Sequence, residues 1–324
     1  MCTNSWKTES RFETPLPLRP PMRAGTRGWR SSRRWAMGRG TSGVEHFVPL
    51  ACHVERGRGS THHTIELSPA QKGWSQVETI YLLTALGAVV AGFVQGLSGF
   101  AFGLVAMSFW AWALEPRLAA CLAVFGALTG QIVAAVTVRR GFDGKLLAPF
   151  LIGGLAGVPV GVWLLPHLDM QGFKAALGGL LVLWCPTMLL SKHLPKLSFG
   201  GRYADAVVGM AGGFLSGMGG FSGTVPTLWC TLRGFQKDTQ RSVIQNFNLA
   251  MLSVTLGIYG ANGLITREVL PFFAIVAPAM LIPSYLGARL YIGLSEARFR
   301  QIVLSLLTVS GLGLLGSSLP KLLA

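Results

Sequence analysis

From residue 76 to residue 324 the sequence is a series of long apolar runs separated by short joints that carry charge, proline or glycine. A helix needs about 20 apolar residues to cross the roughly 30 Å hydrocarbon core of a bilayer. With 51% hydrophobic and 13% charged residues, against about 25% charged in soluble domains, the pattern predicts an all-α polytopic membrane protein with eight full spans and two short or re-entrant segments. The expected segments are 78–97, 99–114, 117–138, 145–166, 172–191, 203–218, 220–232, 242–262, 269–290 and 298–318.

The two short segments, 99–114 and 220–232, each follow a glycine-rich stretch, and these stretches align. Gly92–Gly103 and Gly213–Thr224 are identical at five of twelve positions, where roughly one identity is expected by chance for this composition. The offset of 121 residues grows to 126 where Phe173 corresponds to Phe299. We therefore predict a tail at 1–75 and two membrane repeats, at 76–197 and 198–324.

The odd number of segments in each half predicts that the second repeat is inverted relative to the first. Cytoplasmic loops are enriched in Lys and Arg, and alternate joints carry 12 and 6 of these residues. If each short segment instead continued its predecessor as one broken span, the basic residues outside the tail would divide equally between the two sides of the membrane, 8 against 8. The count favours five segments per half with both termini outside the cytoplasm, and it fits short segments that span or re-enter equally well. The 12 are Arg139, Arg140, Lys145, Lys192, Lys196, Arg202, Arg233, Lys237, Arg241, Arg289, Arg298 and Arg300; the 6 are Arg58, Lys72, Arg117, Lys174, Arg267 and Lys321.

Glycines interrupt apolar runs at the same place in each half, and two interpretations compete. Gly92 with Gly96, and Gly213 with Gly217, have the four-residue spacing of close helix packing. Packing alone does not explain a break followed by a short helix in both halves. Broken helices at matching positions of two halves indicate a transporter binding site, so the pattern favours a functional site.

The breaks also predict the sign of the substrate. A helix N-terminus carries about +0.5 charge and unpaired N–H groups, and inversion would bring the two short-helix N-termini together near the midplane. The sequence therefore predicts an anion site without a cationic side chain. A second set of amides is equally compatible with binding substrate and with helix packing: Gln131 within 117–138, and Gln245, Asn246 and Asn248 within 242–262. The expected substrate-binding residues are Gln95, Gly96, Ser98, Gly99, Ser216, Gly217, Gly219, Gly220, Ser222, Thr224 and Asn246.

Ionisable residues are almost absent from the predicted spans. There is no buried acid of the kind that proton pumps use, and the body contains only two histidines, His167 and His193, both at joints. We therefore expect no enzyme activity, no catalytic residues, no metal and no cofactor. An inside-negative potential favours anion exit by about 2.3 kcal/mol per charge per 100 mV, which favours export.

The formal charge of +15 divides into two parts. The tail at 1–75 holds 12 basic and 5 acidic residues, is rich in Arg, Ser, Gly and Pro, and has no apolar periodicity, so we expect it to be disordered. The remaining positive charge is spread over membrane joints, as topology requires. The sequence therefore predicts a lipid bilayer and a small anion as partners, and no nucleic acid.

The paired motifs Gly92–Gly103 and Gly213–Thr224, each with a short apolar segment after it, resemble the TauE/SafE sulfite exporter family over roughly residues 78–318. The resemblance implies an inner-membrane transporter of small sulfur-containing anions such as sulfite, sulfoacetate or related organosulfonates. The first motif has Ser98 where a glycine is common, and the long basic tail is not typical of the family. Two alternatives stay open: a non-transporting scaffold or accessory subunit, and a permease of the same fold for a different small anion.

Overall fold

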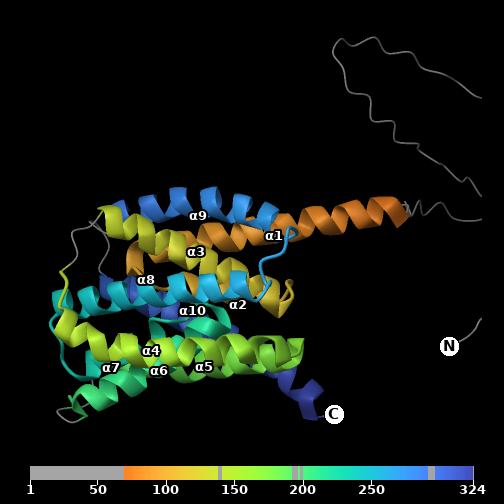
Figure 1. Ribbon diagram of the computed structural model, residues 1–324. Helices are drawn as coiled ribbons and strands as arrows, with labels where there is room; N and C mark the ends of the chain where they lie inside the picture. The colour runs from red at the N-terminus through yellow and green to blue at the C-terminus, as the bar shows by residue number, and fades with distance from the viewer. Residues whose placement is uncertain (1–68, 138–140, 192–195, 198–199, 291–295, 324) are drawn as a thin grey trace, which may run out of the picture. The chain divides into compact units, whose positions relative to one another are not determined.

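The computed structural model describes residues 69–137, 141–191, 196–197, 200–290 and 296–323. These residues form ten α-helices and one short 3-10 helix, with no strand among them (Figure 1). Each of the ten expected segments corresponds to one α-helix. Helix α1 begins earlier than the predicted tail boundary, and residues 1–68 of the tail lie outside the described part. The elements are α1 Pro69–Ser98, α2 Phe102–Trp110, α3 Pro116–Thr137, α4 Gly144–Leu164, η1 Leu165–His167, α5 Met170–Leu190, α6 Gly201–Gly219, α7 Thr224–Leu232, α8 Lys237–Ala261, α9 Leu270–Leu290 and α10 Glu296–Leu323.

Both predicted helix breaks are present, and each is made by a glycine in the left-handed region. Gly99 has φ +82° and Gly220 has φ +79°, a conformation that costs other residues about 1–2 kcal/mol. The Gly99 N–H donates to Gln95 O at 2.7 Å, and the Gly220 N–H donates to Ser216 O at 2.9 Å. Helices α1 and α6 therefore end with the common glycine C-cap, and a new nine-residue helix follows each.

Each short helix folds back along the helix before it. Trp110, at the end of α2, has its indole nitrogen beside Gly87 in the middle of α1. Arg233, which caps the end of α7, forms an ion pair with Asp205 near the start of α6. These contacts exclude the alternative in which each short segment continues its predecessor. At nine residues, or about 14 Å, α2 and α7 cover about half of a bilayer core.

The long helices pack through glycines that allow backbones to touch. On α4, Gly153 lies against Ala206, Gly157 against Met210 and Gly161 against Phe214, so α4 and α6 run parallel. A Cβ at any of the three would collide with a backbone carbonyl oxygen of α6. Close backbone packing of this kind is what associates helices in lipid, where there is no hydrophobic force between them.

Helices α1 and α9 make the contact that corresponds to α6 and α4. Between α1 and α9, Gly92 lies against Met280 and Gly96 against Gly287. Between α6 and α4, Gly213 lies against Gly154 and Gly217 against Gly161. The α1 and α6 members of these pairs are 121 residues apart, and the α9 and α4 members are 126 apart, which are the two offsets in the sequence alignment. Helix α1 of the first half therefore packs on the second half, and α6 of the second half packs on the first.

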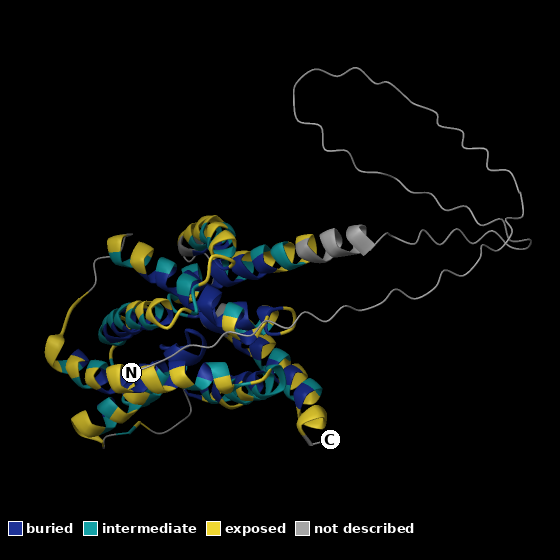
Figure 2. Cartoon of the chain, turned by 45° about the vertical axis from the view of Figure 1, so that its right-hand side comes forward, coloured by how far each residue is buried: buried dark blue, intermediate teal, exposed yellow. Residues whose placement is uncertain are grey.

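Six of the described helices are long and apolar enough to cross a membrane: α1, α3, α4, α5, α9 and α10. Large apolar side chains on these helices are exposed, including Leu82, Ile152 and Val309, each by more than 60%. Exposed positions recur along the described helices (Figure 2). Helices α6 and α8 are long enough but not apolar enough to be selected. Length and composition therefore identify six candidate spans among the described helices, where the sequence predicts eight. Helix α6 is rich in glycine and carries Arg202 and Asp205, and α8 has a buried polar face.

Candidate functional site

Helices α1 and α2 form one helical hairpin and α6 and α7 form a second, and the break in each hairpin is its tip. The two tips meet inside the protein. A Cβ at Gly103, in the first turn of α2, would lie 2.8 Å from the Gly220 carbonyl oxygen and 3.3 Å from that of Gly219. Each break also contacts the long helix of the opposite half. Gly99 faces the Gln245 amide of α8, and Gly220 faces the backbone of Val124 in α3. The residues 245 and 124 are again 121 apart, so the two breaks occupy corresponding positions.

At the first break, side chains from the end of α1 cap the start of α2. Gln95 Oε1 accepts from the Phe102 N–H at 3.0 Å, and Ser98 Oγ accepts from the Ala101 N–H at 3.2 Å. Two of the N–H groups that we expected to be free are therefore occupied. The N–H groups of Gly103 and Leu104, in the first turn of α2, have no intrahelical acceptor.

The other end of the Gln95 amide has no partner. Gln95 is 3% exposed, and its Nε2 makes no hydrogen bond in the described structure. A buried donor left without an acceptor costs about 1–3 kcal/mol, and such groups call for an explanation. Gly130 of α3 leaves room for this nitrogen, because a Cβ there would lie 2.7 Å from it. The first break therefore holds a spare buried N–H donor beside the N-terminus of α2.

At the second break the polar side chains are paired within the protein. Ser222 Oγ donates to Asn248 Oδ1 at 2.9 Å, and the Ser216 and Thr255 hydroxyls lie 2.8 Å apart. The Thr224 hydroxyl donates to Phe221 O at 2.8 Å. Tyr259 OH donates to Gly217 O at 2.7 Å. These hydroxyls are buried, so their pairing removes the cost of burying them.

One face of α8 supplies the polar side chains for both breaks. Gln245, Asn248, Thr255 and Tyr259 follow at steps of three, seven and four, which place them on one side of a helix. From α3, Gln131 Nε2 donates to Gly99 O at 2.7 Å. The polar face turned inward explains why α8 is less hydrophobic than the other long helices.

Trp184 of α5 connects the two breaks directly. Its ring packs edge-on against Phe100 with centroids 6.4 Å apart, and its Nε1 donates to Thr224 O at 2.8 Å. Phe100 follows the glycine of the first break, and Thr224 begins the short helix of the second. A single side chain therefore contacts both breaks, in addition to the direct contact at Gly103.

The structure separates the predicted site residues into three groups. Gly96 and Gly217 lie in helix–helix contacts, against Gly287 and Gly161, which gives them a packing role. Asn246 lies away from both breaks, where its Nδ2 donates to Gly141 O at 3.1 Å. A role in binding substrate stays a prediction for Gly96, Gly217 and Asn246, and equally for the remaining predicted site residues. The structure places at or beside the breaks Gln95, Ser98, Gly99, Ser216, Gly219, Gly220, Ser222 and Thr224.

Five further polar residues reach the breaks: Gln131, Gln245, Asn248, Thr255 and Tyr259. The sequence leaves the first three open between ligand and packing roles, and it does not single out Thr255 or Tyr259. The helical spacing of the four on α8 is the sequence feature that could have selected them over Asn246. Gln131 has no such pattern around it. Its assignment requires the contact between α3 and the first break.

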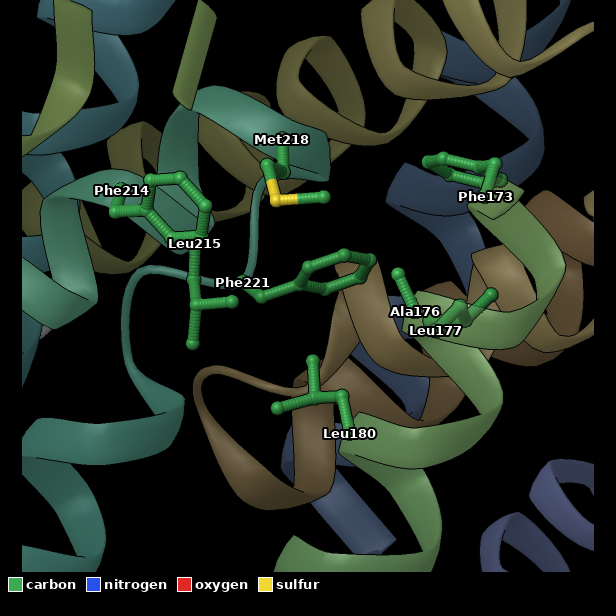
Figure 3. A pocket seen from close by; sticks show the side chains of 8 residues that line it. All are labelled: Phe173, Ala176, Leu177, Leu180, Phe214, Leu215, Met218 and Phe221. Atoms are coloured by element: carbon green, nitrogen blue, oxygen red, sulfur yellow. The ribbon is translucent and has the colours of Figure 1, made fainter. Parts of the chain in front are cut away.

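An apolar cavity of about 150 Å³ opens beside the second break, between α5 and α6 (Figure 3). Phe221, which directly follows Gly220, points into it. The lining carries no charged or hydrogen-bonding side chain, so the cavity has no group to bind an anion. The lining residues are Phe173, Ala176, Leu177, Leu180, Phe214, Leu215, Met218 and Phe221.

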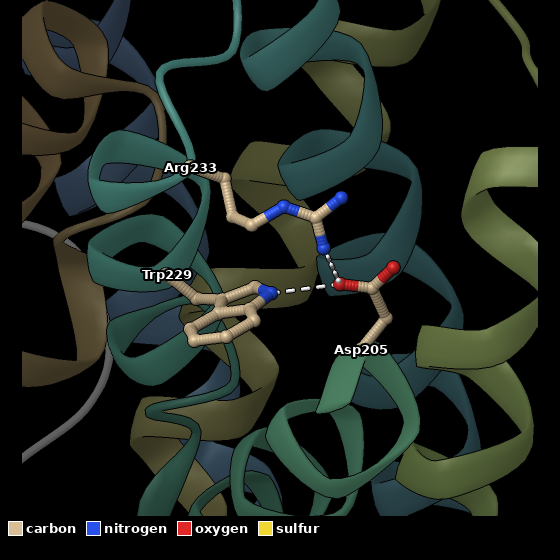
Figure 4. A network of polar contacts seen from close by, with 3 residues as sticks. All are labelled: Asp205, Trp229 and Arg233. Carbon is tan, nitrogen blue, oxygen red and sulfur yellow. Dashed lines mark hydrogen bonds and ion pairs between the residues drawn. The ribbon is translucent and has the colours of Figure 1, made fainter. Parts of the chain in front are cut away.

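The outer end of the second hairpin is held by a buried polar cluster (Figure 4). Asp205 Oδ1 accepts from Trp229 Nε1 at 2.7 Å and from Arg233 Nη1 at 3.1 Å. Asp205 is 3% exposed, which corrects the expectation from the sequence that no acid is buried. Its carboxylate is paired with Arg233, so neither charge is free to bind an anion. The cluster joins the start of α6 to the end of α7, at the end of the hairpin opposite the break.

Comparison with curated proteins and with solved structures finds no match for this chain. The model of the family described as Sulfite exporter TauE/SafE matches residues 84–314. The match covers well over half of the chain and includes both glycine-rich breaks, the two short helices and the polar face of α8. The chain therefore belongs to the sulfite exporter TauE/SafE family, a family of membrane transporters for sulfur-containing anions.

Proposed function

We propose that the protein moves small sulfur-containing oxyanions, such as sulfite, sulfoacetate or related organosulfonates, out of the cytoplasm. The anion binds near the midplane where the two hairpin tips meet. The single observation that carries this proposal is the unpaired Gln95 Nε2, buried beside the N-terminus of α2. An oxyanion oxygen would accept from this donor and from the first-turn N–H groups of α2.

The site suits an anion because its donors are neutral and preorganised. The short-helix N-terminus supplies about +0.5 charge, and the family membership supplies the class of substrate. The Asp205 carboxylate is neutralised by Arg233 at the far end of the hairpin, so it does not oppose binding.

We further propose that the body consists of two inverted repeats and eight full spans, set in the inner membrane with both termini outside the cytoplasm. The reciprocal contacts of α1 with α9 and α6 with α4 support the repeat. Helices α6 and α8 are 19 and 25 residues long, or about 28 and 37 Å. They can cross the bilayer despite their polarity because Arg202 and Arg241 lie near their first turns and several of their other polar side chains, including Gln245, are buried in protein.

The test is flux of sulfite and sulfoacetate in proteoliposomes with an imposed membrane potential. The informative variant is Gln95→Glu, which keeps an oxygen for the Phe102 N–H, replaces the unpaired donor with a second carboxylate oxygen and adds a negative charge that repels an anion. We expect flux to fall at least tenfold, since a hydrogen bond to a charged group contributes about 1.5–3 kcal/mol. Gln301→Glu, the same change at an exposed position of α10, is the matched control.

Two results would count against the proposal. Full flux in Gln95→Glu would place the anion elsewhere. Absence of potential-driven flux of any small sulfur oxyanion, with well-folded wild-type protein, would reject the substrate class itself. A protein without residues 1–68 should behave as the full chain does, because the site is built from helices α1–α8.

A further inference from the structure

A pair of basic side chains lies outside the proposed transport site, between the first turns of α4 and α6. Lys145 and Arg202 line an open groove of about 510 Å³. Both side chains are exposed, and neither has an ion-pair partner among the residues that the structure describes. Two unpaired cations facing one groove are complementary to an anionic group.

Apart from the exposed Tyr203, the remaining side chains of the groove are apolar. Ala148, Pro149 and Ile152 line it along α4, and Ala206 lines it along α6. Ile152 is 69% exposed and lies seven residues beyond Lys145, or about 10 Å further along the helix axis. The groove therefore has a cationic end at the start of the helices and an apolar floor that continues toward the membrane interior.

The helix ends refine where an anion would sit. At α4, the Asp143 carboxylate already accepts from the N–H groups of Lys145 and Leu146, both at 3.1 Å. At α6, the cap residue is Gly200, which provides no side-chain hydrogen bond. The first N–H groups of α6 are thus uncapped, and an anion is favoured on the α6 side of the groove, beside Arg202.

We propose that this groove binds an anionic phospholipid. The phosphate lies between Lys145 and Arg202, and an acyl chain follows the apolar floor past Ile152. Basic pockets between membrane helices bind acidic headgroups in this way. The combination of cations and an adjoining apolar surface favours a lipid over a soluble anion, which would gain nothing from the floor. Both cations belong to the face with the larger number of basic residues, the face that meets the acidic cytoplasmic leaflet.

The test measures lipid binding to the purified full-length protein in detergent, without any transport step. Phosphatidylglycerol and phosphatidylcholine with the same acyl chains are titrated against thermal unfolding, and retained lipid is counted by native mass spectrometry. We expect phosphatidylglycerol to bind preferentially. Each cation near a membrane surface contributes about fivefold, so the double variant Lys145→Ala with Arg202→Ala should weaken phosphatidylglycerol binding about 30-fold.

Controls separate charge from folding and lipid from soluble anion. Lys145→Arg with Arg202→Lys should retain binding, and Arg241→Ala, an exposed cation at the start of α8, should leave it unchanged. Equal binding of the two lipids, or full binding by the double variant, would overturn the proposal. So would inorganic phosphate that stabilises the protein as strongly as the lipid does. If the double variant does not fold, each single variant still carries the test with a fivefold loss.

Discussion

The two helix breaks share a backbone and differ in how their polar side chains are used. Gly99 and Gly220 have nearly the same φ angle, and a nine-residue helix folds back after each. At the first break Gln95 uses one end of its amide and leaves the other buried without a partner. At the corresponding position of the second break, Ser216 is paired with Thr255.

The glycines give both breaks the same backbone geometry, while the polar side chains at the two breaks differ. The second break is braced by hydrogen bonds from α8 and by the Asp205 cluster. The first break keeps an unused donor at its centre. A transporter with two equivalent backbone elements can therefore use one to support the site and the other to contact the substrate, and the variants below are chosen to test that division.

The largest effects are expected from the glycines that both breaks share. Gly99→Leu and Gly220→Leu each force a left-handed residue, at about 1–2 kcal/mol, and displace the short helix that follows. We expect both to abolish flux in proteoliposomes while the protein still reaches the membrane. Gly220→Leu should be the more damaging to folding, because its Cβ would meet the backbone of Val124, whereas that of Gly99 would meet a flexible amide.

Gly257→Leu provides the matched control for these changes. Gly257 is an exposed glycine of α8, and nothing lies within 4 Å of a Cβ built there. It should retain flux and thermal stability. Transport that survives both Gly99→Leu and Gly220→Leu would mean that the breaks do not form the site.

The next largest effect is a loss of stability when the cluster of Asp205, Trp229 and Arg233 in the second hairpin is disrupted. Asp205→Asn removes the negative charge opposite Arg233 and leaves that cation partly buried without a counter-ion. Arg233 is 22% exposed, so the loss should be below the range for fully buried pairs, at about 1–3 kcal/mol. Thermal unfolding in detergent measures it.

A paired change decides whether charge is the reason for that loss. Asp205→Asn combined with Arg233→Gln should recover part of the stability, because no unpaired charge remains. An unchanged unfolding temperature in Asp205→Asn alone would show that the cluster does not hold the second hairpin, and the contrast between the two breaks would weaken.

A smaller effect is expected at the paired hydroxyls of the second break. Ser216→Ala removes its hydrogen bond with Thr255 and should destabilise the protein by about 1 kcal/mol. Its flux should fall less than that of Gln95→Glu, because the Ser216 hydroxyl is already engaged within the protein. A larger loss of flux in Ser216→Ala than in Gln95→Glu would reverse the roles assigned to the two breaks.

The local features of this fold could be read from the sequence because they depend on short-range chemistry. Apolar runs set the ten helices, and the glycines at 99 and 220 set the left-handed caps. The packing of α4 on α6 and α1 on α9 depends on contacts between halves. Spacing of small residues indicated that glycines would pack, but not against which helix. The number of spans stays a prediction, because length and apolar composition select six of the described helices, and α6 and α8 are too polar to be selected in this way.

Single side chains of the site show the same difference between local features, which the sequence can predict, and contacts between distant segments, which it cannot. Adjacent residues of a helix point about 100° apart, so Asn246 faces the Gly141 carbonyl while Gln245 and Asn248 face the breaks. The spacing of polar residues along α8 could have separated them. That Gln95 would cap α2 could not be predicted, because the capping requires α2 to fold back and bring Phe102 within reach of α1.

The smallest expected effect tests whether the two breaks act as one unit. Trp184→Phe keeps a ring beside Phe100 and removes only the hydrogen bond from Nε1 to Thr224 O. The loss should be about 1 kcal/mol in thermal unfolding, with a severalfold reduction of flux, since the spacing of the tips is loosened and neither tip is removed. Trp163→Phe, at an exposed position of α4, should change neither. If Trp184→Phe lowers stability without affecting flux, the tips need not be held at a fixed distance. Anion binding would then rest on the first break alone, with Gln95 and the start of α2 as its whole site.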